Sequence, residues 1–207
     1  MIARQPSSTV GTTELIRPTG ALRESYLSLV ADFLSNGEKL VPFVLSFDHA
    51  DFPAMLARLD DCSRGIGVPP GFVAHSTYWL VHDGEVVGVS NIRHALTPEL
   101  RREGGHIGYG IRPAARRRGF ATEILRRSLE RARDLGIDEA LVTCGKANVA
   151  SARAILRNGG VLASEEHLPE RGEIVQRWLV DNRRARGIVA VPPRQNDRAG
   201  TSQPPHP

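Results

Sequence analysis

Hydrophobic residues recur with a helical period in four parts of the chain. Over 21–37 they come every three or four positions and an Asn-Gly pair closes the pattern, which is typical of an amphipathic helix with a glycine stop. The same period over 119–135, also closed by a glycine, predicts a longer helix. Two shorter helices are expected over 51–63 and over 148–158, the second because Asn148 is a favourable N-cap residue.

Runs of β-branched and aromatic residues between these helices predict strands. The clearest lies over 76–94, where two apolar runs flank Asp83-Gly84, a dipeptide preferred in tight hairpins. The run over 106–113 is interrupted by two glycines, which indicates a bulge or the close approach of a ligand or another chain to the backbone. Further strands are expected over 13–19, 138–144, 161–167 and 174–181.

The order of these elements predicts a mixed α/β (α+β) fold, because it requires both antiparallel and crossover connections. The length of 207 residues suits one domain of ordinary size with loose ends. We expect a flexible N-terminus over 1–12, one domain over 13–180 and a disordered basic tail over 181–207, where the composition turns to Arg, Pro, Gly and Gln.

Composition narrows the class of protein. Hydrophobic residues make up 41% of the chain and charged residues 24%, as in soluble globular proteins. Because the sequence has neither a signal-peptide core nor an apolar run approaching roughly 20 residues, we expect a cytoplasmic protein without a membrane segment. Cys62 and Cys144 lie far apart and lack metal-ligand spacing, so we expect reduced thiols and no metal site, with a catalytic thiol as the minor alternative.

The formal net charge of +4 raises the question of a nucleic-acid partner. Most of that excess lies in the predicted tail, where five arginines face two aspartates. Lys39 and Lys146 are the only lysines, and this near-exclusive use of arginine fits a GC-rich codon bias better than a selected binding surface. We therefore do not expect nucleic acid to be the main partner.

The strongest chemical signal is the sequence "RRRGFAT" (116–122), which stands between the glycine-interrupted strand and the long helix. A helix N-terminus offers an anion unpaired N–H groups and partial positive charge. Gly119 removes a Cβ where a phosphate must approach the backbone, Thr122 adds a hydroxyl, and the three arginines add bidentate donors. The segment predicts a site for a pyrophosphate.

In this arrangement the chain resembles the GNAT superfamily, the acyl-CoA-dependent N-acyltransferases. Arg116, Gly119 and Ala121 fit the family's Arg/Gln-x-x-Gly-x-Gly/Ala loop, and "NVASARAILRNGG" is similar to its Asn-x-x-(Ala/Ser) helix. The likeness covers residues 76–180, approximately. It implies a mostly antiparallel central sheet of about six to seven strands, flanked by helices, in which the central strands splay apart.

The resemblance also implies an activity, namely an acetyl-CoA-dependent N-acetyltransferase that transfers the acetyl group directly to a primary amine of a small molecule or peptide. The pantetheine arm of acetyl-CoA would pair with the backbone of 109–113 like an added strand. The pyrophosphate would lie on the amides of 117–122, and Asn148 and Ser151 would border the cofactor where the strands splay. Asn148 can also be a helix cap alone. The implied cofactor-binding residues are Tyr109, Gly110, Ile111, Arg112, Arg116, Arg117, Arg118, Gly119, Phe120, Ala121, Thr122, Asn148 and Ser151.

Acyl transfer to an amine needs a base, because an alkylamine with a pKa near ~10 is mostly protonated at neutral pH. Many members of the family carry a Glu at the strand position that is His106 here, and an imidazole is a competent base at that pH. His106 is therefore the candidate base, and the alternative is a histidine that only packs or hydrogen bonds. The family's Tyr that protonates the leaving thiolate is replaced by Ile155, so Tyr109 or Tyr78 supplies the proton or the thiolate leaves unaided.

The acceptor side is less clearly marked. Tyr26 lies on the helix that usually walls the acceptor cleft in this family, and Asn91, Arg93 and His94 follow a strand beside His106. Arg93 would suit an acceptor with a carboxylate or a phosphate. The alternative is that Arg93 and His94 are ordinary loop residues.

Two other functions stay open at this level. One is a non-catalytic acyl-CoA-binding module, which is consistent with Ile155. The other is a nucleic-acid binder that uses the arginines of 116–118 and the tail, and it predicts salt-sensitive affinity. The sequence does not indicate the acceptor, the length of the acyl chain or whether the chain forms a homodimer.

Overall fold

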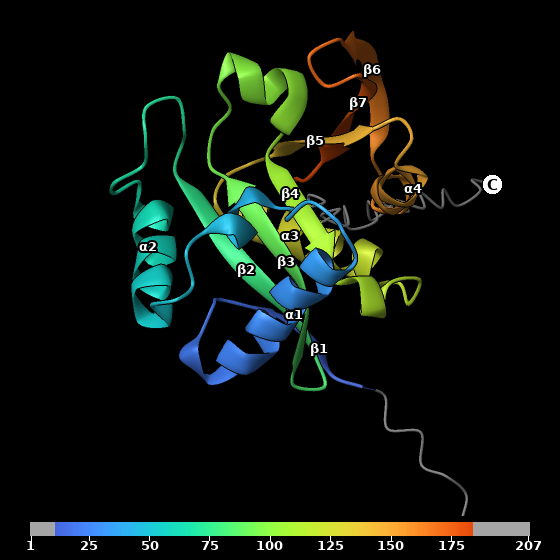
Figure 1. The fold of residues 1–207 in the computed structure, drawn as a ribbon. Coiled ribbons are helices and arrows are strands. Elements are labelled where there is room, and N and C mark those ends of the chain that lie inside the picture. The colour runs from blue at the N-terminus through green and yellow to red at the C-terminus, as the bar shows by residue number, and fades with distance from the viewer. Residues whose placement is uncertain (1–10, 184–207) are drawn as a thin grey trace, which may run out of the picture.

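Two antiparallel sheets form the frame of the protein (Figure 1). The structure, a computed structural model, describes residues 11–183, so the predicted N-terminal segment and tail lie almost entirely outside the described residues. The larger sheet has four strands in the order β1-β2-β3-β4, and the smaller has three in the order β5-β7-β6. The strands are β1 Thr13–Ile16, β2 His75–His82, β3 Glu85–Arg93, β4 Ile107–Ile111, β5 Glu139–Gly145, β6 Val161–Leu168 and β7 Glu173–Asp181.

The predicted splay lies between β4 and β5, the facing edge strands of the two sheets. At the start of β4, the backbone N–H of His106 donates a hydrogen bond to the carbonyl oxygen of Leu141 at 2.7 Å. Among the described residues, no ladder joins the two strands beyond this point. Helix α3 (Phe120–Asp134) connects them as a crossover.

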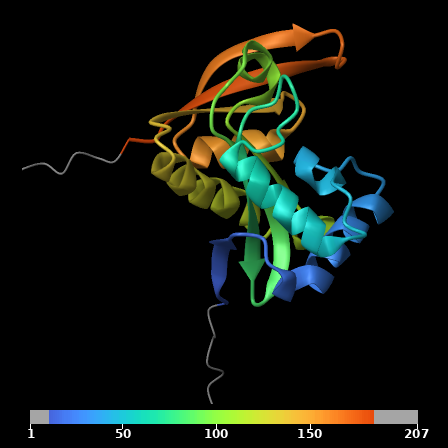
Figure 2. The same cartoon turned by 90° about the vertical axis from the view of Figure 1, so that its left-hand side faces the viewer.

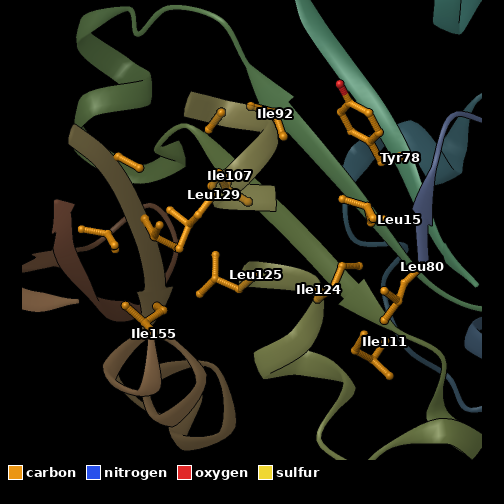
Figure 3. Close-up of a cluster of buried hydrophobic side chains, with 14 of the residues drawn as sticks. Leu15, Tyr78, Leu80, Ile92, Ile107, Ile111, Ile124, Leu125, Leu129 and Ile155 are labelled. Atoms are coloured by element: carbon orange, nitrogen blue, oxygen red, sulfur yellow. The ribbon is translucent and has the colours of Figure 1, made fainter. Parts of the chain in front are cut away.

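Helices cover both faces of the larger sheet (Figures 1 and 2). On one face lie α1 (Arg23–Ser35) and α2 (Phe52–Arg64), where Tyr26 stacks on Trp79 with ring centroids 4.7 Å apart. On the other face lies α3, with α4 (Val149–Arg157) packed against it. Figure 3 shows the cluster on this second face, in which Ile107 and Ile111 of β4 share a core with residues of α3.

The two glycines of β4 face the opposite side from its isoleucines, because strand side chains alternate. A Cβ on Gly110 would collide with the carbonyl oxygen of Val41, whereas a Cβ on Gly108 would meet only ordinary contacts, the nearest at 3.7 Å. The glycine at 110 therefore lets the segment after α1 cross directly over β4. The sequence predicted a close approach here, and in this fold the approaching group is the protein's own chain.

The helices and strands begin and end within three residues of their predicted positions. Between β3 and β4 lies one element that the sequence pattern did not predict, a helical turn at Leu100–Gly104 (η3). Short 3-10 turns occur at Gly20–Leu22, Phe43–Ser46 (η2) and Pro113–Ala115. None of the helices between residues 11 and 183 has the length and apolarity needed to span a bilayer.

Candidate active site

A cavity of about 570 Å³ lies where β4, the start of α3 and α4 meet. The loop that follows α1 closes it through Glu38, Lys39 and Val41. The cavity brings together most of the residues that the family resemblance assigned to the cofactor. These are Tyr109, Gly110, Ile111, Arg116, Arg117, Gly119, Phe120, Ala121, Thr122, Asn148 and Ser151.

The start of α3 is built to present backbone N–H groups to this cavity. Gly119 is the N-cap with φ of 87°, a left-handed conformation that glycine adopts without strain. Arg117 is also left-handed, with φ of 61°. Within the described chain, the amides of Phe120 and Ala121 have no hydrogen-bond acceptor, while those of Thr122 and Glu123 bond to the Gly119 carbonyl. Free amides at a helix N-terminus suit a phosphate group.

Cations surround these amides. Besides Arg116 and Arg117, the cavity is lined by Lys39, Arg153 and Arg157, which the sequence reading missed. Arg153 and Arg157 are four residues apart on α4, so a search for cations on one face of that helix would have found them.

Only one carboxylate, that of Glu38, lies among the cavity's described lining residues. It binds Arg116 through two hydrogen bonds of 2.6 and 2.5 Å, and this pairing lowers the pKa of Glu38. Since one carboxylate opposes five cations, the cavity is electropositive and suits a polyanion.

Two predicted cofactor residues point elsewhere. The Arg112 side chain binds Asp32 at 3.2 Å and Ser28 at 3.1 Å, both on α1. The Arg118 guanidinium lies over the Phe120 ring, 5.0 Å from its centroid. Neither residue lines the cavity.

A second cavity, of about 330 Å³, opens between β4 and β5 and shares Val41, Tyr109, Asn148 and Ser151 with the first. The Asn148 side chain caps α4 by accepting a hydrogen bond from the Ser151 N–H at 3.1 Å. The Tyr109 hydroxyl lies 2.9 Å from the Ser151 hydroxyl, and burial raises the pKa of Tyr109 to about 12. The two cavities therefore meet at a protonated phenol.

The wall of the second cavity carries both signs of charge. Arg171 binds Glu173 at 2.7 Å and Glu103 at 3.5 Å, and Arg93 and Cys144 also line this space. The sequence did not single out Glu103, Arg171 or Glu173. They come from η3, from the β6–β7 connection and from β7, which no sequence spacing links.

His106 joins the two sheets rather than lining a cavity. Its Nδ1 accepts a hydrogen bond from the Leu141 N–H at 2.9 Å, in addition to the backbone bond already described. Burial, with smaller contributions from Arg101 and Arg93, lowers its pKa to about 4. Because Nδ1 is an acceptor, the neutral ring carries its proton on Nε2. These contacts favour the hydrogen-bonding role over the general base, the two roles that the sequence left open.

Three of the predicted acceptor residues are held by contacts within the fold, two of them buried and the third, His94, half-buried. Tyr26 is 2% exposed and belongs to the core under α1, which corrects its assignment to the acceptor cleft. Asn91 is 0% exposed, and its Nδ2 donates to His75 Nδ1 at 2.8 Å. His94 Nε2 lies 2.9 Å from the Ser76 hydroxyl. None of these three lines a cavity among the described residues, because each is engaged within the fold, whereas Arg93 lines the second.

A family model described as an acetyltransferase (GNAT) domain matches residues 33–161, which is more than half of the chain. The matched stretch runs from the end of α1 to the start of β6 and includes both the 116–122 loop and α4. The chain belongs to the GNAT family of acetyltransferases.

Solved structures of other GNAT proteins share the fold. RimL, a ribosomal L7/L12 α-N-protein acetyltransferase in complex with coenzyme A, is 18% identical with a TM-score of 0.60 over 86% of this chain and 98% of its own. MccE, a microcin C7 self-immunity acetyltransferase in complex with acetyl-CoA and AMP, is 15% identical. The match has a TM-score of 0.56 and covers 81% of this chain and 91% of MccE. The putative acetyltransferase yncA from Salmonella typhimurium, solved with acetyl-CoA, is 13% identical. The match has a TM-score of 0.54 and covers 86% of this chain and 98% of yncA. A search among curated proteins finds no match.

The departure from the GNAT pattern at Ile155 has a structural reason. Its side chain is 0% exposed and packs in the cluster shared by α3 and β5 (Figure 3). Tyr78 is likewise a core residue. Of the residues considered as proton donors, Tyr109 is the one that reaches the junction of the two cavities.

Proposed function

We propose that this GNAT protein is an acetyl-CoA-dependent N-acetyltransferase that transfers the acetyl group directly to a primary amine of a small molecule or peptide. The observation that carries the proposal is the junction of two cavities with different chemistry. One is electropositive and ends at helix amides, and the other contains two carboxylates. A thioester in the first and an amine in the second would meet at Tyr109 and Ser151.

The donor half of the site fits acetyl-CoA, which would supply the acetyl group as a thioester. The amides at the start of α3 and the surrounding cations would hold its phosphates. The edge of β4 that faces β5 has free backbone groups for the pantetheine amides, because β4 pairs only with β3 in the described chain. Support also comes from RimL, MccE and yncA, whose solved structures contain coenzyme A or acetyl-CoA.

Within the chemical step, Tyr109 is our candidate for the group that hydrogen bonds to the leaving sulfur. With a pKa of about 12 its hydroxyl stays protonated at neutral pH, and Ser151 orients it. The carboxylates of Glu103 and Glu173 would attract the amine as an ammonium ion. His106 would act as a positioning residue that holds β4 against β5.

Direct transfer is supported by the state of Cys144. This thiol lines the second cavity, but burial raises its pKa, so it is protonated at neutral pH and a poor nucleophile. An acyl-enzyme intermediate would require a thiolate there.

The test is thiol release from acetyl-CoA across a panel of amines, with calorimetric measurement of acetyl-CoA binding. Arg153→Ala should weaken acetyl-CoA binding about fivefold to tenfold by removing a cation from the phosphate cavity. The matched control is Arg64→Ala, an exposed arginine at the end of α2 that lines none of the described cavities. Equal affinities of the two variants would contradict the assignment of this cavity to the cofactor.

The buried Ile155 favours one alternative, a GNAT module that binds acyl-CoA without catalysis. Binding of acetyl-CoA combined with no thiol release on any amine would select this alternative.

A further inference from the structure

A third cavity, of about 240 Å³, continues the second one on the side away from the cofactor. The two share Phe43 and Arg93 as a common wall. The surface of the third cavity is mostly apolar, with side chains from η2, the loop before β2 and η3, although His75 and Glu99 also line it. Among the apolar residues Phe72 is 54% exposed, so an aromatic ring stands open to solvent next to the cavity. An apolar space that continues an acceptor cavity suits an apolar part of the acceptor.

Arg93 stands at the boundary between these two cavities. Its Nη1 donates to the carbonyl oxygens of Gly104 and Gly105, both at 3.0 Å. Its Nη1 and Nη2 atoms lie 3.8 Å from the point that a Cβ on Gly108 would occupy, so the guanidinium lies against β4. Burial lowers the pKa of Arg93, which means that the fold disfavours its charge.

The two carbonyl groups use only part of the donor capacity of Arg93. A guanidinium has five N–H donors, and Nη1 supplies only two of them. In the part of the chain that the structure describes, no carboxylate lies within ion-pairing distance of Arg93. A largely buried guanidinium without a counter-anion is costly unless a ligand supplies the anion. The fork of Arg93 matches a carboxylate.

The other charged group of the second cavity has the opposite sign. Glu103 and Glu173 share a single cation, Arg171, so this cluster carries a net negative charge. Glu173 and Ser151 line the same cavity as Tyr109, where the acetyl group would be transferred. One cavity thus offers a negative cluster for an ammonium ion, a free guanidinium for an anion and an apolar extension beyond that guanidinium.

We propose that the acceptor is an α-amino acid with an apolar side chain, whose carboxylate binds Arg93 and whose side chain occupies the third cavity. This inference rests on the proposed function. The ammonium group is held by the negative cluster before transfer. The ammonium ion first loses one proton to solvent, and the neutral nitrogen then forms its bond to the acetyl carbon as the carbon–sulfur bond breaks. The second proton that the nitrogen loses goes to the departing thiolate.

The experiment compares thiol release with four kinds of amine. These are leucine and phenylalanine, their carboxamides, alanine, and a short peptide with a free N-terminus. We expect the free apolar amino acids to have kcat/KM values about 10- to 100-fold above those of their amides, because the amide loses the charge-assisted contact with Arg93. Alanine should fall below leucine because it leaves the third cavity empty.

Two variants separate the contacts. Arg93→Gln should remove the preference for the acid over the amide. Because this ratio is measured within one variant, a partial loss of folded protein does not affect it. Val73→Trp should fill the third cavity and lower activity on phenylalanine more than on alanine. Its control is Ile66→Trp, which adds the same side chain at a half-exposed position of the preceding loop, outside the cavity.

The outcomes distinguish the inference from the function on which it rests. If the amides or the peptide are acetylated as well as the free acids, the acceptor proposal is wrong while the acetyltransferase stands. If no amine in the panel releases thiol, the proposed function fails and the acceptor proposal falls with it. Retention of the acid preference in Arg93→Gln would also overturn the assignment.

Discussion

The proposed donor and acceptor halves of the site use arginine in opposite ways. In the donor cavity, Arg117 and Arg153 are exposed to solvent, so their charge is kept at little desolvation cost and attracts a polyanion. In the acceptor half, Arg93 is largely buried against two carbonyl groups, so its charge carries a desolvation cost that a specific anionic partner would offset. Exposed arginines give affinity for a class of ligand, whereas a buried one discriminates between ligands.

The largest expected effect comes from the wall that both halves share. Gly110→Ala would force the Val41 carbonyl away from β4, and Val41 lines the first and second cavities. We expect a loss of about 2–3 kcal/mol in the free energy of unfolding, together with most of the activity. Urea denaturation measures the first and thiol release the second.

Gly108→Ala is the matched control for stability, because its Cβ would make only ordinary contacts. If the two alanine variants unfold at the same urea concentration, the crossing segment does not constrain β4 as described.

The next effect concerns the point where the halves meet. Tyr109→Phe should lower kcat about 10- to 100-fold and leave acetyl-CoA affinity nearly unchanged, because it removes only the hydroxyl that we propose hydrogen bonds to the leaving sulfur. Steady-state kinetics and calorimetry separate the two quantities. The control is Tyr78→Phe, which removes a hydroxyl from a core residue. An equal fall in kcat in this control would contradict the assignment of Tyr109 as the proton donor.

A moderate effect is expected from pH. His106 and His75 have pKa values lowered to about 4 from 6.5, so the unfolded chain binds more protons between these values and stability falls as pH drops from 6.5 towards 4. Thermal unfolding across this range measures the slope. His106→Gln should make it shallower, since the amide oxygen can still accept from Leu141.

The same variant tests the role of His106 in catalysis. If wild-type kcat/KM shows an acid limb near the lowered pKa of His106, about 4, and this limb disappears in His106→Gln, the residue is the general base and the positioning role is wrong.

The smallest effect is an expected absence of change. Intact-protein mass spectrometry after incubation with acetyl-CoA alone should find no acetyl group on Cys144, because its raised pKa keeps the thiol protonated. A stable acetyl adduct on this residue would replace direct transfer with an acyl-enzyme route.

The sequence predicted most of the residues that line the first cavity, because that part of the site is nearly continuous in the chain. Gly119 and the arginines before it form a local motif, and Asn148 caps the next helix at a recognisable spacing. The acceptor half is assembled by tertiary contacts instead. Glu103 and Glu173 are brought together only when η3 packs beside the β6–β7 connection, and nothing in their local sequence indicates this.

The error at Tyr26 and the open question of the role of His106 have the same physical cause, which is burial. Tyr26 was placed at the acceptor cleft from the family's usual arrangement, but its ring is buried in the core, where it stacks on Trp79. His106 was selected for its intrinsic pKa, which burial and the Leu141 contact alter. Residue identity predicts which chemistry a side chain can perform, whereas burial decides whether it is accessible for that chemistry.

The interruption of the sheet between β4 and β5 also affects the dynamics of the free protein. Backbone amides of β4 that face β5 have no strand partner beyond His106 in the described chain, so they are open to exchange with solvent. A ligand lying along this edge would complete the ladder and protect them. Amide exchange in β4 thus reports occupancy of the site, and the folded protein gains stability from its ligand in proportion to the logarithm of the ligand concentration.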